Sequence, residues 1–266
     1  MWLLNMDDIA LRTGRDVLAV DLLGFGRSSR PKMAASSPGE AEAFFVDSLR
    51  QLFDKLELER VALVGHSLGG FLSAVFAMQN RARVEKLVLA SPVGVPVRPA
   101  DYDSKVQSRF FRVLLNLWER GVTPQALVRF AGPRGEKLVD SVVRRRFRRF
   151  WTLSPEQHDH LATYVYQISV AAPSGEQSMN NLLMPGAFAR LPLESRIEQL
   201  DPTLETLWLY GASDWMDPRK PIEWMGADNR NRRAWQLRFV EDAGHQLFME
   251  RPARFNELCS DFLRQV

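Results

Sequence analysis

The stretch 61–78 reads VALVGHSLGGFLSAVFAM and contains three elements in order. It begins with an apolar run typical of a buried strand, turns sharply at Gly65-His66-Ser67-Leu68-Gly69, and continues as a helix-compatible apolar run. This order predicts a nucleophile elbow, in which the serine backbone is strained and the two glycines let strand and helix approach without a Cβ clash. We therefore expect Ser67 to be a nucleophile at the end of a sheet. The N–H of Leu68, at the positive end of the helix dipole, is expected to receive a developing oxyanion.

Length and composition describe a chain that can bury a substantial core. Its 266 residues are 45% hydrophobic and carry a net charge of +3, which fits one domain with an insertion. The single cysteine, Cys259, excludes an internal disulfide framework, fits a reducing compartment and is typical of a core thiol. We expect no metal ion and no cofactor, because the sequence shows no ligand cluster and no complete phosphate-binding motif. No apolar run approaches the length of a membrane span, so we expect a cytoplasmic protein, soluble or peripheral on a membrane or lipid droplet.

Alternating apolar segments predict an α/β fold. Further strands are predicted at 17–21, 84–90, 206–210 and 235–240. Helical spacing of apolar residues predicts amphipathic helices over 44–56 and 255–263. Because strands and helices alternate, the sheet is expected to be mainly parallel. Between residues 96 and 195 the alternation gives way to a mostly helical pattern, so we expect a core formed by 1–95 and 196–266 with a helical cap at 96–195.

A catalytic serine needs a base to take its proton, and the base needs an acid to fix its tautomer. In the α/β-hydrolase fold these residues follow one another in the order Ser, Asp or Glu, His. Asp214 lies just past the predicted strand 206–210 and His245 just past 235–240, at the sheet edge where Ser67 is expected. Asp217 is the competing acid, and the spacing Gly211-x-x-Asp214 favours Asp214. The other histidines are expected to be structural or solvated: His66, His158 and His160.

Several runs spread over nearly the whole chain resemble the α/β-hydrolase domain-containing proteins 4 and 5 and their plant and fungal relatives. These runs are DLLGFGRSSRP at 21–31, GHSLGGFL at 65–72, PSGE at 173–176, FARLP at 188–192 with Glu194 and Arg196, and DWMD at 214–217. The resemblance implies substrates such as glycerophospholipids, N-acyl phosphatidylethanolamines, lysophospholipids or cardiolipin, with lysophosphatidic acid acyl transfer as a further activity. The lipase-coactivator branch of that family carries Asn at the elbow, so Ser67 resembles the hydrolytic branch. A serine lipid hydrolase is the implied function, and a lipid-surface scaffold or lipase coactivator is the alternative.

The sequence departs from this family at two places. The family's proposed acyltransferase signature is His-x-x-x-x-Asp, whereas here it ends in Glu250, which keeps the charge and adds a methylene. Family members also begin with several further strands and a His-Gly loop that supplies a second oxyanion donor, and this sequence starts after that loop. We therefore expect an N-terminally truncated sequence that lacks the first strands. The alternative is a natural chain that has lost function or receives its missing strand from a partner.

A basic and aromatic run in the predicted cap is relevant to which surfaces or molecules the protein binds. It reads RRRFRRFW at 144–151. One interpretation is a membrane-surface patch, with arginines at lipid phosphates and aromatic rings in the interface. The other is a helix face whose aromatic residues pack inward. A nucleic-acid partner is not expected, because no nucleic-acid fold signature accompanies the charge, and the sequence predicts no oligomeric state.

Overall fold

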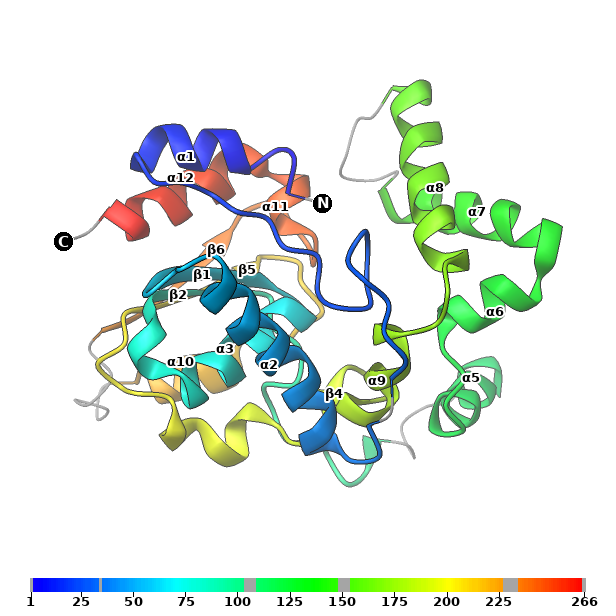
Figure 1. Ribbon diagram of the computed structural model, residues 1–266, viewed down its shortest axis with the longest axis horizontal. Coiled ribbons are helices and arrows are strands. Elements are labelled where there is room, and N and C mark those ends of the chain that lie inside the picture. The colour runs from blue at the N-terminus through cyan, green and yellow to red at the C-terminus, as the bar shows by residue number, and fades with distance from the viewer. Residues whose placement is uncertain (1, 34, 103–108, 148–153, 227–233, 265–266) are drawn as a thin grey trace. The chain divides into compact units, whose positions relative to one another are not determined.

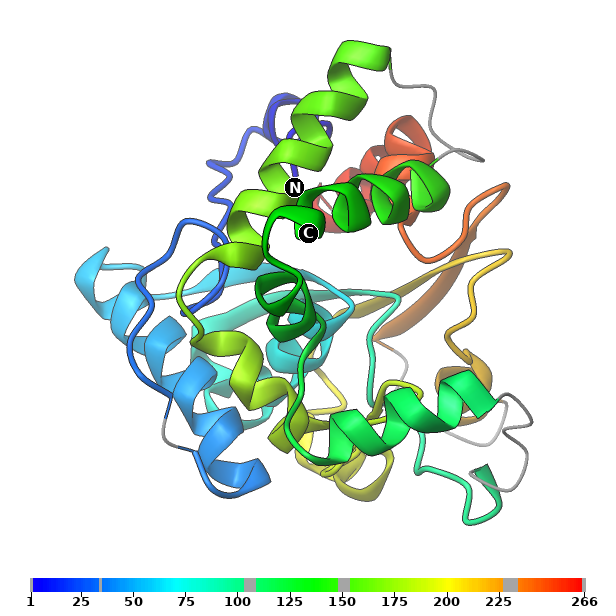
Figure 2. The ribbon, with the colours of Figure 1, turned by 90° about the vertical axis from the view of Figure 1, so that its right-hand side faces the viewer.

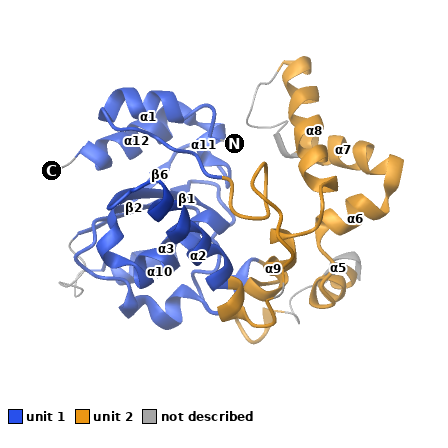
Figure 3. Cartoon of the chain, in the orientation of Figure 1, with its two compact units in different colours: residues 1–20, 42–97, 187–266 blue, residues 21–41, 98–186 orange. Residues whose placement is uncertain are grey.

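The structure is a computed structural model that describes residues 2–33, 35–102, 109–147, 154–226 and 234–264. The chain forms two compact units, coloured separately in Figure 3. One consists of 1–20, 42–97 and 187–266, and the other of 21–41 and 98–186. The domain boundaries expected from the sequence stay a prediction.

The first unit is built on a four-stranded sheet that carries three of the predicted strands and the strand of the elbow (Figure 1). Its strands are β1 (Val61–His66), β2 (Val84–Ala90), β5 (Thr206–Gly211) and β6 (Trp235–Val240), in the order β1-β2-β5-β6. Every pairing is parallel, which confirms the predicted sheet type. Because parallel strands run in one direction, the residues that follow β1, β5 and β6 emerge at the same edge of the sheet.

Helices cover both faces of this sheet. Figure 1 shows α1 (Met6–Thr13) and α12 (Pro252–Arg264) on one side, and α2 (Pro38–Lys55) and α3 (Leu68–Gln79) on the other. Helix α3 is apolar nearly all round and is buried from residue 70 to 77, as expected for a helix in the core. The shorter elements are η1 (Arg81–Arg83), β4 (Phe188–Ala189), η3 (Leu193–Gln199), α10 (Arg219–Trp224) and α11 (Leu247–Glu250). Cys259 is a buried thiol on α12, as predicted.

The strand predicted at 17–21 is wrong. The structure gives these residues no strand, and their apolar side chains face solvent, with Leu18 63% and Val20 42% exposed. A run of apolar residues forms a strand only when a neighbouring strand takes up its backbone hydrogen bonds, and no strand among the described residues pairs with this run. The preceding segment instead forms α1, a helix not predicted from the sequence.

The second unit is mainly helical between residues 98 and 186, which lie within the stretch 96–195 whose pattern predicted mostly helices. Its elements are α5 (Arg109–Glu119), α6 (Pro124–Phe130), η2 (Gly132–Arg134), α7 (Gly135–Phe147), α8 (Pro155–Val170), α9 (Gly175–Leu182) and β3 (Leu183–Met184). Helices α6, α7 and α8 pack against one another, as the green segments of Figure 2 show. Ser154 starts α8 with a reciprocal cap in which its side chain and that of Gln157 each accept a backbone N–H. The buried carboxylate of Glu176 is paired with Arg129 at 2.9 Å.

The second half of the basic run at 144–151 lies outside the described residues, which end at 147 and resume at 154. Arg144 is described, and it binds the carboxylates of Asp140 and Asp159. Arg144 is therefore engaged within its own unit rather than presented as an unpaired cation. Among the described helices, none combines the length and the hydropathy required to span a bilayer.

A buried amide pair joins α1 to α12. Asn5 and Asn256 are 1% and 2% exposed. The Asn5 Nδ2 donates to Asn256 Oδ1 at 2.7 Å and to the Phe248 carbonyl at 2.9 Å. The Asn256 Nδ2 donates to the Leu4 carbonyl and to Asp8 Oδ2, both at 3.0 Å. The pair thus fixes the start of α1 on α12 through buried hydrogen bonds, whose loss leaves unpaired polar groups behind.

Replacing Asn256 by alanine should lower the free energy of unfolding by about 2–3 kcal/mol, because Asn5 and the Leu4 carbonyl then lose buried partners. Urea denaturation followed by circular dichroism measures this change. The matched control is Glu257→Ala on the same helix, whose exposed side chain contacts Arg254 and whose removal should change stability by less than about 0.5 kcal/mol. Equal effects of the two substitutions would contradict the role given to the amide pair.

Candidate active site

Ser67 occupies a strained turn between β1 and α3. Its φ of 55° and ψ of −117° lie in a region that residues with a side chain rarely adopt. The Ser67 N–H donates to the Ala90 carbonyl on β2 at 3.0 Å, and its own carbonyl accepts from Phe71 on α3 at 3.1 Å. The turn is therefore tied to both the strand and the helix it joins, and the elbow expected from the sequence is present.

The close approach in this turn is at Gly65. A Cβ there would lie 2.4 Å from the Gly69 carbonyl oxygen and 2.6 Å from the Ser73 hydroxyl, so only glycine fits. The same expectation for Gly69 is wrong, because a Cβ at that position meets no atom within 4 Å. The second tight position is Gly70, where a Cβ would lie 3.0 Å from the Gly65 carbonyl oxygen.

The structure brings Asp214 and His245 to Ser67. Asp214 follows β5 and His245 follows β6, at the sheet edge where β1 ends in the elbow. The His245 Nδ1 lies 3.2 Å from Asp214 Oδ1, and its Nε2 lies 3.1 Å from the Ser67 Oγ. Because a carboxylate only accepts hydrogen bonds, the proton of a neutral imidazole belongs on Nδ1, which leaves Nε2 as an acceptor for the serine hydroxyl.

The pKa of Asp214 lies below its ordinary value although the side chain is buried. Its side chain is 1% exposed and that of His245 is 7% exposed. Burial by itself raises the pKa of Asp214, but the hydrogen bonds from His245 and from the Met216 N–H outweigh it, so that its pKa lies below the usual value. An ionised carboxylate is therefore held against the imidazole of His245.

Asp217, the alternative acid, faces a different partner. Its carboxylate accepts from the Arg219 guanidinium at 2.5 Å and from the Arg219 N–H at 2.9 Å. The hydrogen bond with the Arg219 side chain holds the pKa of Asp217 below its ordinary value. Leu68, the candidate oxyanion donor, is the first residue of α3, so its N–H has no acceptor within the helix.

The remaining histidines differ in their surroundings. His66, expected to be structural, places Nε2 at 2.7 Å from the His245 carbonyl oxygen. Its ring centroid is 4.8 Å from those of His245 and Phe248. His158 and His160 lie on α8 in the other unit. The described residues contain no group of three or more acidic, histidine or cysteine side chains that could hold a metal ion.

One aromatic residue beside the site, Trp215, was not predicted from the sequence. Trp215 is 56% exposed, and its ring centroid lies 5.2 Å from that of His245. Its position directly after Asp214 was the available signal, because a residue next to a candidate acid at a strand end shares the same edge. The exposed indole offers an apolar surface adjoining the imidazole.

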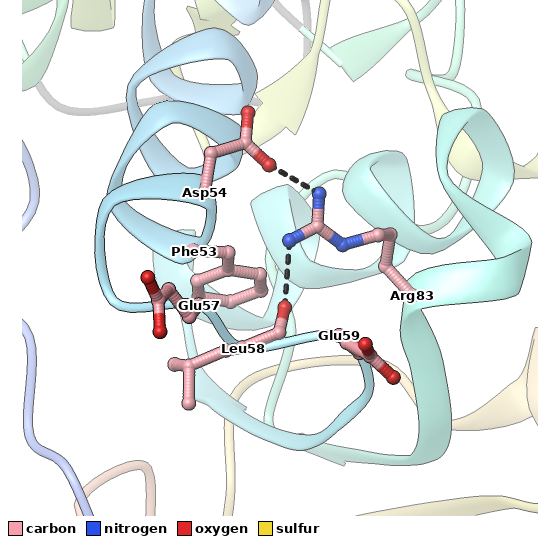
Figure 4. Close-up of a pocket in the computed structure, with 6 residues that line it drawn as sticks. All are labelled: Phe53, Asp54, Glu57, Leu58, Glu59 and Arg83. Carbon is pink, nitrogen blue, oxygen red and sulfur yellow. Dashed lines mark hydrogen bonds and ion pairs between the residues drawn. The ribbon is translucent and has the colours of Figure 1, made fainter.

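A surface pocket lies at the other edge of the sheet (Figure 4). It is lined by Phe53, Asp54, Glu57, Leu58, Glu59 and Arg83. Arg83 crosses it to bind the Asp54 carboxylate at 2.5 Å and the Leu58 carbonyl at 2.6 Å. These residues precede β1 and β2, whereas Ser67 follows β1. The pocket is therefore separate from the cluster of Ser67, Asp214 and His245, by about one strand length.

The chain is similar to proteins named as hydrolases and acyltransferases, which share one fold with it. The family model described as the alpha/beta hydrolase fold matches residues 4–252. The 1-acylglycerol-3-phosphate O-acyltransferase ABHD5 of Rattus norvegicus is 33% identical over 269 residues, covering 100% of this chain and 74% of the relative. The (lyso)-N-acylphosphatidylethanolamine lipase of Mus musculus is 30% identical over 272 residues, covering 100% and 76%. A meta-cleavage product hydrolase from Pseudomonas fluorescens IP01 superposes with a TM-score of 0.64 at 23% identity, covering 98% of this chain and 83% of that one, which shows the shared fold.

The two elbow glycines should respond differently to alanine. Gly65→Ala should lower the free energy of unfolding by at least about 2 kcal/mol, because its Cβ would overlap backbone atoms of Gly69. Gly69→Ala should leave stability unchanged or raise it by up to about 1 kcal/mol, because alanine favours the helix and meets open space. Thermal and urea unfolding of both variants measure this. A loss at Gly69 as large as that at Gly65 would contradict the geometry.

Proposed function

We propose that this chain, which belongs to the α/β-hydrolase fold family and to its subfamily of α/β-hydrolase domain-containing proteins 4 and 5, is a serine hydrolase of lipid acyl esters. One observation carries the proposal: the hydrogen-bonded series from Asp214 through His245 to Ser67, at 3.2 and 3.1 Å. A nucleophile, a base within reach of its proton and an acid that fixes the base are the groups that acyl transfer requires.

In the proposed reaction Ser67 Oγ attacks the ester carbonyl carbon while His245 Nε2 takes the hydroxyl proton. The carbonyl oxygen becomes an oxyanion, and the Leu68 N–H, which has no acceptor within its helix, donates to it. His245 then passes its proton to the departing alcohol oxygen, which leaves an acyl-enzyme on Ser67. Water attacks this ester with His245 again as the base, and the released fatty acid regenerates the serine. Asp214 accepts the hydrogen bond from the Nδ1–H of His245 throughout the reaction.

The names of two relatives support the substrate class that we propose. One is named as a lipase of N-acylphosphatidylethanolamine and its lyso form, and the other as an acyltransferase that uses 1-acylglycerol 3-phosphate. We therefore assign (lyso)phospholipid acyl esters as substrates, with acyl transfer as a second outcome when a lipid alcohol replaces water at the acyl-enzyme. Such substrates reside in membranes and lipid droplets, so the proposal includes peripheral contact with a lipid surface.

Ser67→Ala should abolish ester cleavage, with a loss of about 10⁶-fold in kcat, because no other group then attacks the carbonyl. Release of fatty acid from lysophosphatidylethanolamine and from N-acyl phosphatidylethanolamine in mixed micelles measures the activity. Covalent labelling by a fluorophosphonate should disappear in the same variant. If the unaltered protein binds lipid vesicles but is neither labelled nor active, the enzyme hypothesis is wrong. The protein is then a lipid-surface scaffold or a lipase coactivator.

Asp214→Asn should lower kcat by about 10⁴-fold while the protein stays folded, because the amide no longer selects the required imidazole tautomer. Asp217→Asn is the matched control, since its carboxylate binds Arg219 rather than His245, and its activity should stay within about twofold of the original. Steady-state hydrolysis of a soluble short-chain ester compares the two. A large loss in Asp217→Asn with little loss in Asp214→Asn would assign the acid to Asp217 instead.

A further inference from the structure

We propose that Glu250 is a positioning residue for the general base, because its carboxylate holds the backbone on both sides of His245. The Glu250 Oε2 accepts the N–H of Gly244 at 2.5 Å, and the Oε1 accepts the N–H of Gln246 at 3.1 Å. One side chain thus binds the residue before and the residue after the imidazole. This role rests on the proposed function of His245, and it adds a residue that does not touch substrate.

A third side chain, that of His66, also binds the backbone of the turn at 244–246. The His245 carbonyl oxygen lies 2.7 Å from His66 Nε2, and since a carbonyl only accepts, His66 must carry a proton on that nitrogen. Three consecutive residues, 244–246, are therefore each fixed by a side chain: two through their N–H groups and one through its carbonyl. The backbone of His245 is held independently of the hydrogen bonds made by its imidazole.

The surroundings explain why a carboxylate is suited to this position. Gly244 is buried and His245 is 8% exposed, so an amide N–H here that lost its acceptor would remain unsatisfied. A carboxylate accepts two N–H groups at once, and hydrogen bonds to an ionised acceptor are stronger than those to a neutral one. The imidazole must also reach Ser67 on another strand, where a displacement of about 1 Å can cost about 100-fold in rate.

Helix capping accounts for only half of this geometry. Gln246 is the residue before α11, and a carboxylate that reaches back to such an N–H caps the helix. The contact with Gly244 lies two residues further upstream, outside the helix, and is the shorter of the two. The pair of contacts therefore brackets His245 rather than the helix start. Both carboxylate oxygens accept from the backbone of their own turn, which is a different use from the acyl-transfer role that the family signature implied for this position.

The test compares Glu250→Gln with Glu241→Gln in the full chain. The glutamine has one oxygen and an NH2 group, so it accepts from one amide and opposes the other. We expect kcat for ester hydrolysis to fall about 100-fold with KM within about twofold, because the base is displaced and the substrate surface is not. Glu241 is an exposed carboxylate four residues before His245, and its variant should match the original protein. Glu250→Asp, which keeps the charge on a shorter arm, should give an intermediate kcat, and it carries the test if Glu250→Gln does not fold.

A second readout is independent of turnover. Amide hydrogen exchange, measured by NMR, should become at least about tenfold faster in Glu250→Gln at whichever of Gly244 and Gln246 faces the new NH2 group, and stay unchanged at both in Glu241→Gln. Hydrolysis within twofold of the original in Glu250→Gln would overturn the proposal, since an acid needed only for acyl transfer leaves hydrolysis intact. If the unaltered protein lacks activity and Ser67 is not labelled, the proposed function fails by itself. The exchange rates at Gly244 and Gln246 then test whether Glu250 holds this turn. Unchanged rates in Glu250→Gln would overturn the proposal.

Discussion

The contact between Gly65 and the Gly69 carbonyl is the constraint on which the site depends. At this point β1 and α3 approach so closely that a Cβ on Gly65 would lie 2.4 Å from a backbone oxygen. The chain reverses direction within these few residues, which is why Ser67 adopts a positive φ of 55°. The strain is sustained by the hydrogen bonds of Ser67 to β2 and α3. The position of Ser67 at the sheet edge therefore depends on having glycine at residue 65.

Gly211 provides the same kind of close backbone contact near Asp214 and His245. A Cβ on Gly211 would lie 2.2 Å from the Gly244 carbonyl oxygen and 2.4 Å from that of Ala243. The turn that carries His245 therefore rests directly on the end of β5, and the Ser213 N–H donates to the Ala243 carbonyl at 2.9 Å. Asp214 is the next residue along. Its short distance to His245 follows from this backbone contact between two strand ends, in the way that the elbow follows from Gly65.

Local patterns predicted the parts of this structure that local physics decides. The apolar runs at 84–90 and 235–240 gave strands with the predicted bounds, and the Gly-His pair after the last strand indicated the candidate base. The run at 17–21 failed because strand pairing depends on a distant neighbour. The same limit hid the contact of Asn5 with Asn256, which are 251 residues apart. Glu250 could be singled out from a signature, but its two backbone partners required the geometry.

The buried charge of Asp214 explains why the turn at His245 needs support from several directions. Burial opposes ionisation of Asp214, and hydrogen bonds led by that of His245 reverse the effect, so the folded pKa lies below the unfolded one. A lowered pKa means that this group stabilises the fold above its unfolded pKa and loses that contribution as the pH falls through the folded value. The stabilisation therefore depends on an imidazole at a fixed distance. Contacts that fix the His245 backbone through Glu250 and His66 also maintain the ionised acid, because each keeps the donor where the carboxylate requires it.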